Sequence, residues 1–293
     1  MHLKRRRLPL PWLIAPLLCL AIAMQMLIPA RSEEVSRQAV DLFKIGPIPI
    51  TNSMVTAWLV SIALIVAIRI AIGRRPSPVP TRAQAALEII AENLRSLFEP
   101  IVGSRAIGNV FPFLLILFTF LLAENLCGLI PGVGSIAVGN GHGHFVPILR
   151  PPNGDLNGTL ALAIISFSAW IFFVLRHAGP KEFFHDTFGN KGDRREVPLP
   201  IYAFLGAVFL AVGAIDVISI LFRIVSLSFR LYGNVFGGEN LIGRMSGLCG
   251  AILPVPFYFL ELLIGVIQAF VFTLLTAVYI GLLTAGGSEE RHG

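Results

Sequence analysis

Long apolar runs separated by short polar segments make up most of the chain. Three of these runs, at residues 54–72, 111–130 and 156–175, are close to the 20 or so residues that a helix needs to cross a bilayer. A longer apolar stretch covers residues 201–244, and a last one covers 257–283. The pattern predicts an all-α, polytopic membrane protein with about five membrane helices.

Two segments depart from this pattern. Residues 82–104 place apolar side chains along one side of a helix and charged side chains elsewhere, which predicts an amphipathic helix on the membrane surface. Residues 1–30 begin with a basic cluster at 4–7 and continue as an apolar run, the pattern of a signal peptide. An uncleaved extra span is the alternative for this segment. We expect residues 31–293 to form a single membrane domain.

The charge distribution predicts the orientation in the membrane. Only 14% of the 293 residues are charged, against about a quarter in soluble domains. Lysine and arginine concentrate in alternate polar segments, which predicts residues 73–105, 176–197 and the C-terminus on the cytoplasmic side. The glycine- and proline-rich loop at 131–155, which carries Arg150, is then predicted on the outer side. The formal net charge of +6 therefore reflects topology and does not indicate a nucleic-acid partner.

The apolar run at 201–244 carries a polar seam. Its polar and small residues follow one another at intervals of three or four, so they form one narrow stripe on a helix. A charge at bilayer depth costs on the order of 2.5–3.5 kcal/mol, so the seam implies a watery groove or charged partners. The seam consists of Asp216, Ser219, Arg223, Ser226, Arg230, Asn234 and Gly237.

The helix that carries the seam is too long to cross a bilayer upright. Forty-four residues rise roughly 66 Å, so we expect a strong tilt or a bend at Gly233 or at 237–238. Glu239 follows Arg230 by nine residues and therefore points from the opposite face. An arginine near a helix end often extends its head to the interface. That reading suits Arg244 and stays open for Arg223.

The last apolar run carries a second stripe, formed by Glu261, Gly265, Gln268 and Tyr279. A glutamate inside an apolar run favours proton exchange over a permanent charge. The alternative is an acid that pairs with Arg244 at the interface. If residues 198–285 form an antiparallel hairpin, they bring Arg230, Gln268, Glu239 and Glu261 into one neighbourhood.

Motifs for covalent or cofactor chemistry are absent from the sequence. It contains no nucleotide-binding loop, no zinc-protease motif and no nucleophile elbow. The three cysteines are far apart, and the two histidines at 142 and 144 lie in a glycine-rich loop, where solvent exposure is the simpler reading. We therefore expect no cofactor, no metal and no catalytic residue, and acids, arginines and amides at bilayer depth indicate an ion path.

Several blocks of the sequence resemble subunit a of F-type ATP synthases. The most specific is Ser-Leu-Ser-Phe-Arg-Leu-Tyr-Gly-Asn at 226–234, followed by Gly-Gly-Glu at 237–239. The resemblance continues at 125–131, 268–279 and 288–290. It implies a non-catalytic subunit beside a rotating ring of c subunits, with two offset half-channels for protons that lead to the carboxylates of the ring.

The resemblance also implies partners and a location. The partners are the c-ring, the subunit b peripheral stalk, other ATP synthase subunits, the lipid bilayer and the transported proton. The location is the bacterial inner membrane.

The resemblance assigns roles to individual residues. Arg230 matches the essential arginine between the two half-channels, and Arg223 matches a position that is commonly basic. Positions that line the outer half-channel correspond to Asn125, Glu239, Glu261 and Gln268. Positions toward the inner half-channel correspond to Asp216 and Asn234, with Ser226 nearby. Many members pair an acid with a histidine where this chain has Glu239 and Glu261, and two neighbouring acids do not both ionise easily.

Other function classes remain open. A stand-alone transporter or channel often shows inverted repeats, and the two halves of this chain do not match. A scaffold subunit has no reason to bear the cost of charges in the seam. A sodium-coupled version of the same complex is also open, because ion selectivity lies mainly in the ring.

Overall fold

The fold is that of a computed structural model, which describes residues 41–45, 48–73, 81–104, 106–130, 137–140, 144–147, 149–177, 179, 199–249 and 253–289. The predicted signal peptide at 1–30, the basic pair at 74–75, His142 and most of the polar segment at 176–197 lie outside these residues.

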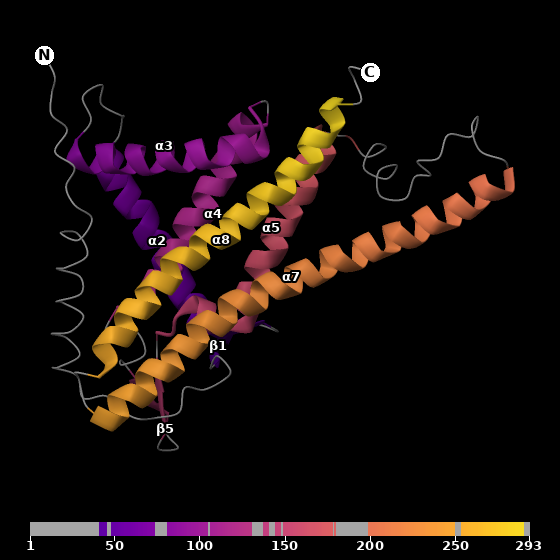
Figure 1. The fold of residues 1–293 in the computed structure, drawn as a ribbon. Coiled ribbons are helices and arrows are strands. Elements are labelled where there is room, and N and C mark those ends of the chain that lie inside the picture. The colour runs from indigo at the N-terminus through magenta and orange to yellow at the C-terminus, as the bar shows by residue number, and fades with distance from the viewer. Residues whose placement is uncertain are drawn as a thin grey trace, which may run out of the picture. The chain divides into compact units, whose positions relative to one another are not determined.

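Five helices of the described part are long and apolar enough to cross a membrane. They are α2 (Asn52–Ile72), α4 (Ile107–Cys127), α5 (Leu156–His177), α7 (Leu199–Cys249) and α8 (Pro254–Glu289), coloured in chain order in Figure 1. The prediction of an all-α, polytopic membrane protein with about five membrane helices is confirmed.

The amphipathic helix predicted at 82–104 is also confirmed, as α3 (Arg82–Val102). The hydroxyl of Thr81 caps its first turn by accepting a hydrogen bond from the backbone N–H of Gln84 at 3.3 Å. Gly103 ends it with a φ of 88°, a conformation that glycine adopts without strain. Leu94 and Phe98 are buried, whereas most of its charged side chains are exposed.

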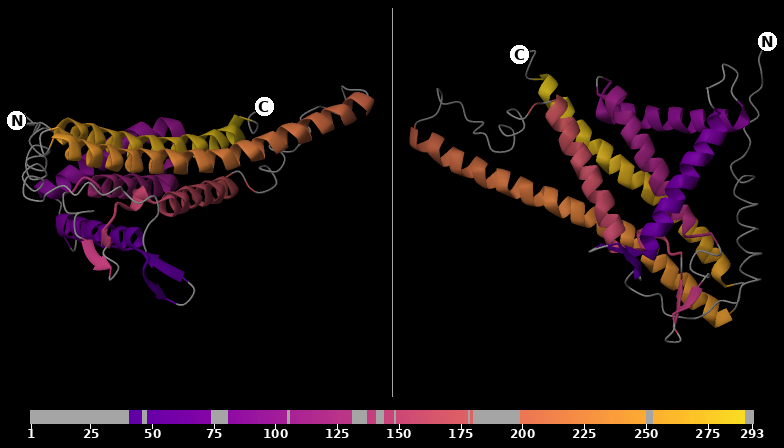
Figure 2. Two further views of the ribbon diagram at one scale, coloured as in Figure 1. Left: turned by 90° about the horizontal axis from the view of Figure 1, so that it is seen from below. Right: turned by 180° about the vertical axis from the view of Figure 1, so that it is seen from behind.

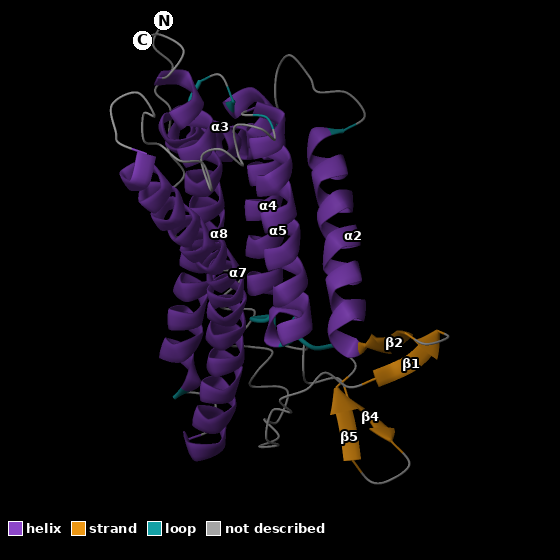
Figure 3. Ribbon diagram, turned by 90° about the vertical axis from the view of Figure 1, so that its right-hand side faces the viewer, coloured by secondary structure: helices purple, strands orange, loops and turns teal. Residues whose placement is uncertain are grey.

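Two β-hairpins stand where the sequence predicted loops (Figure 3). Strands β1 (Asp41–Ile45) and β2 (Ile48–Thr51) pair antiparallel, and so do β4 (Ala137–Asn140) and β5 (His144–Pro147). Backbone groups outside a helix still need hydrogen-bond partners, and a short hairpin supplies them. A 3₁₀ turn, η1 (Pro152–Gly154), then leads into α5.

The last two helices are longer than predicted. Helix α7 has 51 residues and continues through Gly233 and the glycine pair at 237–238, so its helical pattern is not interrupted there. Helix α8 starts at Pro254, three residues before the apolar run at 257–283, and so includes both Pro254 and Pro256. Proline fits the first turn of a helix because that turn needs no N–H donor. The residues after this apolar run are helical to Glu289.

The described residues fall into two compact units. Unit 1 comprises those within 1–62, 122–155 and 232–267, and unit 2 comprises those within 63–121, 156–231 and 268–293. Helices α2, α4, α7 and α8 contribute to both units. In unit 2, α3 runs crosswise to its neighbours α2 and α4 (Figures 1 and 2).

The interiors of the two units differ in chemistry. Apart from the prolines at 151, 152 and 254, Ile50 is the one buried apolar side chain among the described residues of unit 1, and the other buried apolar side chains belong to unit 2. Fully buried apolar side chains of unit 2 include Phe98, Leu114, Leu121, Phe272 and Ile280. Unit 1 instead buries polar and charged groups, and its interior is therefore the first place to look for a functional site.

Candidate ion-translocation site

A cluster of polar side chains occupies the interior of unit 1. It draws on α4, on the segment between β5 and α5, on the last part of α7 and on the first part of α8. We call it the unit 1 polar cluster, and it consists of Glu124, Asn125, Arg150, Asn153, Glu239 and Glu261.

Asn125 ties three segments of the cluster together. Its amide nitrogen donates to the carbonyl of Gly265 on α8 at 3.0 Å, and its amide oxygen accepts from Asn153 Nδ2 at 2.8 Å. Gly265 permits this approach, because a Cβ there would lie 3.2 Å from the Cβ of Asn125. The two hydrogen bonds fix the orientation of an amide that is 7% exposed.

The segment that carries Arg150 is anchored on α2. The backbone N–H of Arg150 donates to the hydroxyl of Thr56 at 3.1 Å, and the hydroxyl of Ser53 donates to Asp155 Oδ2 at 2.9 Å. Within the segment, Arg150 Nη2 donates to the carbonyl of Gly154 at 2.9 Å. These bonds hold a charged residue of the predicted outer loop inside the unit.

The carboxylate of Glu239 faces this segment. A Cβ placed on Gly154 would lie 3.1 Å from Glu239 Oε2 and 3.6 Å from Arg150 Nε, so the two charged groups flank the same glycine. The charges of Arg150 and Glu261 both act on Glu239, the first attracting it and the second repelling it.

The carboxylate of Glu261 lies directly against Gly238 of α7. The end of α7 and the start of α8 run side by side in unit 1 (Figures 1 and 2), and the missing side chain at Gly238 leaves the space that Glu261 fills. The predicted neighbours Glu239 and Glu261 are thus brought together. Arg244, the alternative partner of Glu261, is exposed.

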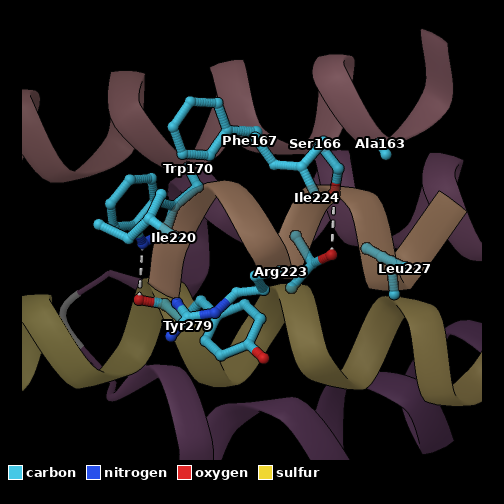
Figure 4. A pocket seen from close by; sticks show the side chains of 10 residues that line it. Ala163, Ser166, Phe167, Trp170, Ile220, Arg223, Ile224, Leu227 and Tyr279 are labelled. Carbon is cyan, nitrogen blue, oxygen red and sulfur yellow. Dashed lines mark hydrogen bonds between the residues drawn. The ribbon is translucent and has the colours of Figure 1, made fainter. Parts of the chain in front are cut away.

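In unit 2, Arg223 lines a small pocket between α5, α7 and α8 (Figure 4). Its guanidinium carbon lies 3.6 Å from the centroid of the Tyr279 ring, a close cation–π contact. Trp170 Nε1 donates to the backbone carbonyl of Tyr279 at 2.9 Å, and the hydroxyls of Ser166 and Thr276 are hydrogen-bonded at 2.8 Å. The cavity measures about 30 Å³, room for a water molecule.

The other predicted residues of unit 2 differ in exposure. Asp216, Ser226 and Arg230 are exposed on α7, whereas Gln268 on α8 is buried. Large apolar side chains beside the seam are exposed as well, with Phe222 69% exposed. Asn234 belongs to unit 1 and is half-buried.

Sequence reasoning missed part of the unit 1 polar cluster. The sequence predicted Arg150 only as a charged residue of the outer loop. Glu124 and Asn153 were not predicted as site residues. The available signal was the polar run Arg-Pro-Pro-Asn-Gly-Asp at 150–155, immediately before a membrane span.

Comparisons with known proteins point to one family. The family model described as "ATP synthase A chain" matches residues 54–281. ATP synthase subunit a of Moorella thermoacetica is 34% identical over 241 residues, which cover 82% of this chain and 94% of the relative. ATP synthase subunit a 2 of a Bradyrhizobium species is 30% identical over 240 residues, 82% of this chain and 92% of the relative.

A further relative bears on the transported ion. The protein named "ATP synthase subunit a, sodium ion specific" from Propionigenium modestum is 30% identical over 233 residues, which cover 79% of this chain and 73% of the relative. The family match spans well over half of the chain and includes all nine residues to which the resemblance assigns roles. This multi-pass membrane protein belongs to the ATP synthase subunit a family.

Proposed function

We propose that this chain is the proton-conducting stator subunit of the membrane sector of an ATP synthase. The observation that carries the proposal is the polar interior of unit 1, where Glu239 and Glu261 lie together within membrane-spanning helices. Ionisable groups inside membrane helices are costly in free energy, and those that a protein retains there mark ion paths.

The unit 1 polar cluster lines the outer half-channel, and the resemblance in sequence adds Gln268 to the residues of that path. Glu239 and Glu261 accept and release protons, and Asn125 offers an oriented amide that can hold a water molecule in the path. The inner half-channel follows the seam of α7, with Asn234, Ser226 and Asp216. The partners are a ring of c subunits, the subunit b stalk and the remaining ATP synthase subunits.

Arg230 separates the two paths. An arginine is always charged at physiological pH, so it attracts a deprotonated carboxylate on the ring and releases it once that carboxylate is protonated. Its exposure on α7 leaves the guanidinium accessible to such a partner. The fixed positive charge also repels a proton that would otherwise pass straight from one half-channel to the other.

The first test is ATP-driven acidification of inverted membrane vesicles that contain the assembled complex. Arg230→Ala is expected to abolish acidification at a normal amount of assembled complex. Arg69→Ala is the matched control, because Arg69 is an exposed arginine of α2 outside the proposed paths. Wild-type acidification by Arg230→Ala would make the seam a structural feature and favour a transporter.

A sodium-coupled version of the same complex is a second candidate, because one relative is named sodium ion specific. The same vesicles separate the two candidates. ATP-driven uptake of labelled sodium that persists in the presence of a protonophore would identify sodium as the coupling ion. Acidification without sodium uptake would identify the proton.

The proposed location is the bacterial inner membrane with the C-terminus in the cytoplasm. The distribution of lysine and arginine along the sequence supports this orientation.

A further inference from the structure

Arg150 is a cation in the interior of unit 1. Its residue is 5% exposed, and hydrogen bonds to Thr56 and Gly154 hold it there. An arginine does not lose its proton in a protein, and an unpaired buried charge is strongly destabilising. Arg150 therefore requires an anion inside the same unit.

Glu239 is the acid placed to supply that anion. Arg150 Nε and Glu239 Oε2 flank Gly154, and both atoms are buried without a hydrogen-bond partner in the described part of the chain. Of the other acids of unit 1, Asp155 accepts a hydrogen bond from Ser53, and Glu124 is hydrogen-bonded to Asn153, although its Oε2 also has no hydrogen-bond partner in the described part of the chain. Glu239 is the acid that shares Gly154 with Arg150 and that the charge of Arg150 attracts.

Glu261 adds a second carboxyl group beside the first. One cation and two carboxyl groups are neutral together when the carboxyl groups hold one proton between them. With two protons the group carries one positive charge, and with none it carries one negative charge, and both states are unfavourable in a low-dielectric interior. The neutral state contains one proton donor and one proton acceptor.

We propose that Arg150 is a positioning residue of the outer proton path, whose buried charge keeps one of Glu239 and Glu261 ionised and so able to accept a proton. The inference rests on the proposed function and assigns a role to a residue of the segment before α5. Without Arg150, the neutral state of the pair has both carboxyl groups protonated, and it offers no acceptor to an incoming proton.

Charge balance makes a specific prediction for a double variant. In Glu239→Gln, Arg150 and an ionised Glu261 are neutral together without an exchangeable proton, so ATP-driven acidification is expected to fall by about tenfold or more. In Arg150→Gln with Glu239→Gln, Glu261 is neutral when protonated and can again exchange its proton. The double variant is therefore expected to acidify about fivefold faster than Glu239→Gln alone.

The matched control removes a different positive charge from the same unit. Arg244 is exposed on α7, and Arg244→Gln with Glu239→Gln is expected to stay as slow as Glu239→Gln. If Arg150 only holds the segment in place, then Arg150→Gln with Glu239→Gln acidifies vesicles more slowly than Glu239→Gln alone. Equal or slower acidification by the Arg150→Gln double variant would therefore overturn the inference.

Conservative replacement provides a second readout. Arg150→Lys keeps the charge and is expected to retain acidification within about twofold of wild type, whereas Arg150→Gln loses about tenfold. Rates are divided by the amount of assembled complex. If the Arg150→Gln complex does not assemble, the test rests on Arg150→Lys alone. A tenfold loss of acidification rate per assembled Arg150→Lys complex would overturn the inference.

Failure of the proposed function looks different. If Glu239→Gln and Glu261→Gln each acidify vesicles at the wild-type rate, the outer path does not use this pair, and the role of Arg150 falls with it. If Glu239→Gln is slow but is not relieved by Arg150→Gln, the outer path stands and the inference about Arg150 alone is wrong.

Discussion

At the scale of single residues, amides and glycines give the acids of the unit 1 polar cluster their geometry. Asn125 connects α4 to α8 and to the turn before α5. Gly238 and Gly154 leave room for the carboxylates of Glu261 and Glu239. Buried polar groups must be hydrogen-bonded or they destabilise the fold, and Asn125 satisfies two of them at once. The residues that do not carry charge thus determine where the charged ones lie.

Replacing Asn125 by alanine tests this role. The change removes the hydrogen bond to the Gly265 carbonyl, which keeps its partner within α8, and leaves the buried Asn153 amide without this acceptor, at a cost of about 1–3 kcal/mol for the amide. Asn125→Ala is expected to lower the temperature at which the detergent-solubilised complex dissociates. The measurement heats samples and records the loss of the band of assembled complex on a native gel. Asn109→Ala is the control, since Asn109 is exposed on the same helix. Equal dissociation temperatures for the two variants would show that the Asn125 hydrogen bonds contribute nothing measurable.

At the scale of helices, close approach depends on single glycines. In unit 2, Gly281 of α8 lies directly against the backbone carbonyl of Ile101 near the end of α3. A side chain at position 281 would meet backbone and not a flexible side-chain end, so it cannot be accommodated by a rotamer change. The contact fixes how near the amphipathic helix can lie to α8.

Gly281→Ala is therefore expected to push α3 away from α8 and destabilise unit 2 by on the order of 1–3 kcal/mol, as overpacking does elsewhere. Gly108→Ala is the control, because a Cβ at Gly108 would meet no atom within 4 Å. Trypsin cleavage at Arg95 in vesicles measures the effect, and faster cleavage is expected in Gly281→Ala alone. An unchanged cleavage rate would mean that the helices adjust without cost.

At the scale of the whole molecule, the sequence predicted the helices better than the site. The five membrane helices and α3 follow from apolar run lengths and amphipathic spacing, which are local properties. The two β-hairpins were not predicted, because short strands in glycine- and proline-rich segments have the composition of loops. The buried position of Arg150 was not predicted, because it depends on contacts with residues far along the chain, such as Thr56, 94 positions away. Glu239 and Glu261 were predicted as neighbours because pairing of the last two helices follows from their connection.

The polar interior of unit 1 also constrains how the protein is made. Asn125 meets its acceptor Gly265 140 residues later in the chain. At about 5–20 residues per second of synthesis, α4 waits on the order of ten seconds for α8 to emerge. During that interval its amide and Glu124 need water or a chaperone-like neighbour at the insertion site.

A nascent chain that stops before α8 never completes this interior. A chain ending at residue 253 is therefore expected to be cleared by membrane proteases faster than the full chain in a pulse-chase experiment. A chain ending at 289, which keeps all of α8, is expected to persist like the full chain. Equal lifetimes for all three would mean that the early helices are stable without their late partners. Faster loss of the shorter chain alone would show that quality control of this subunit depends on the arrival of its last helix.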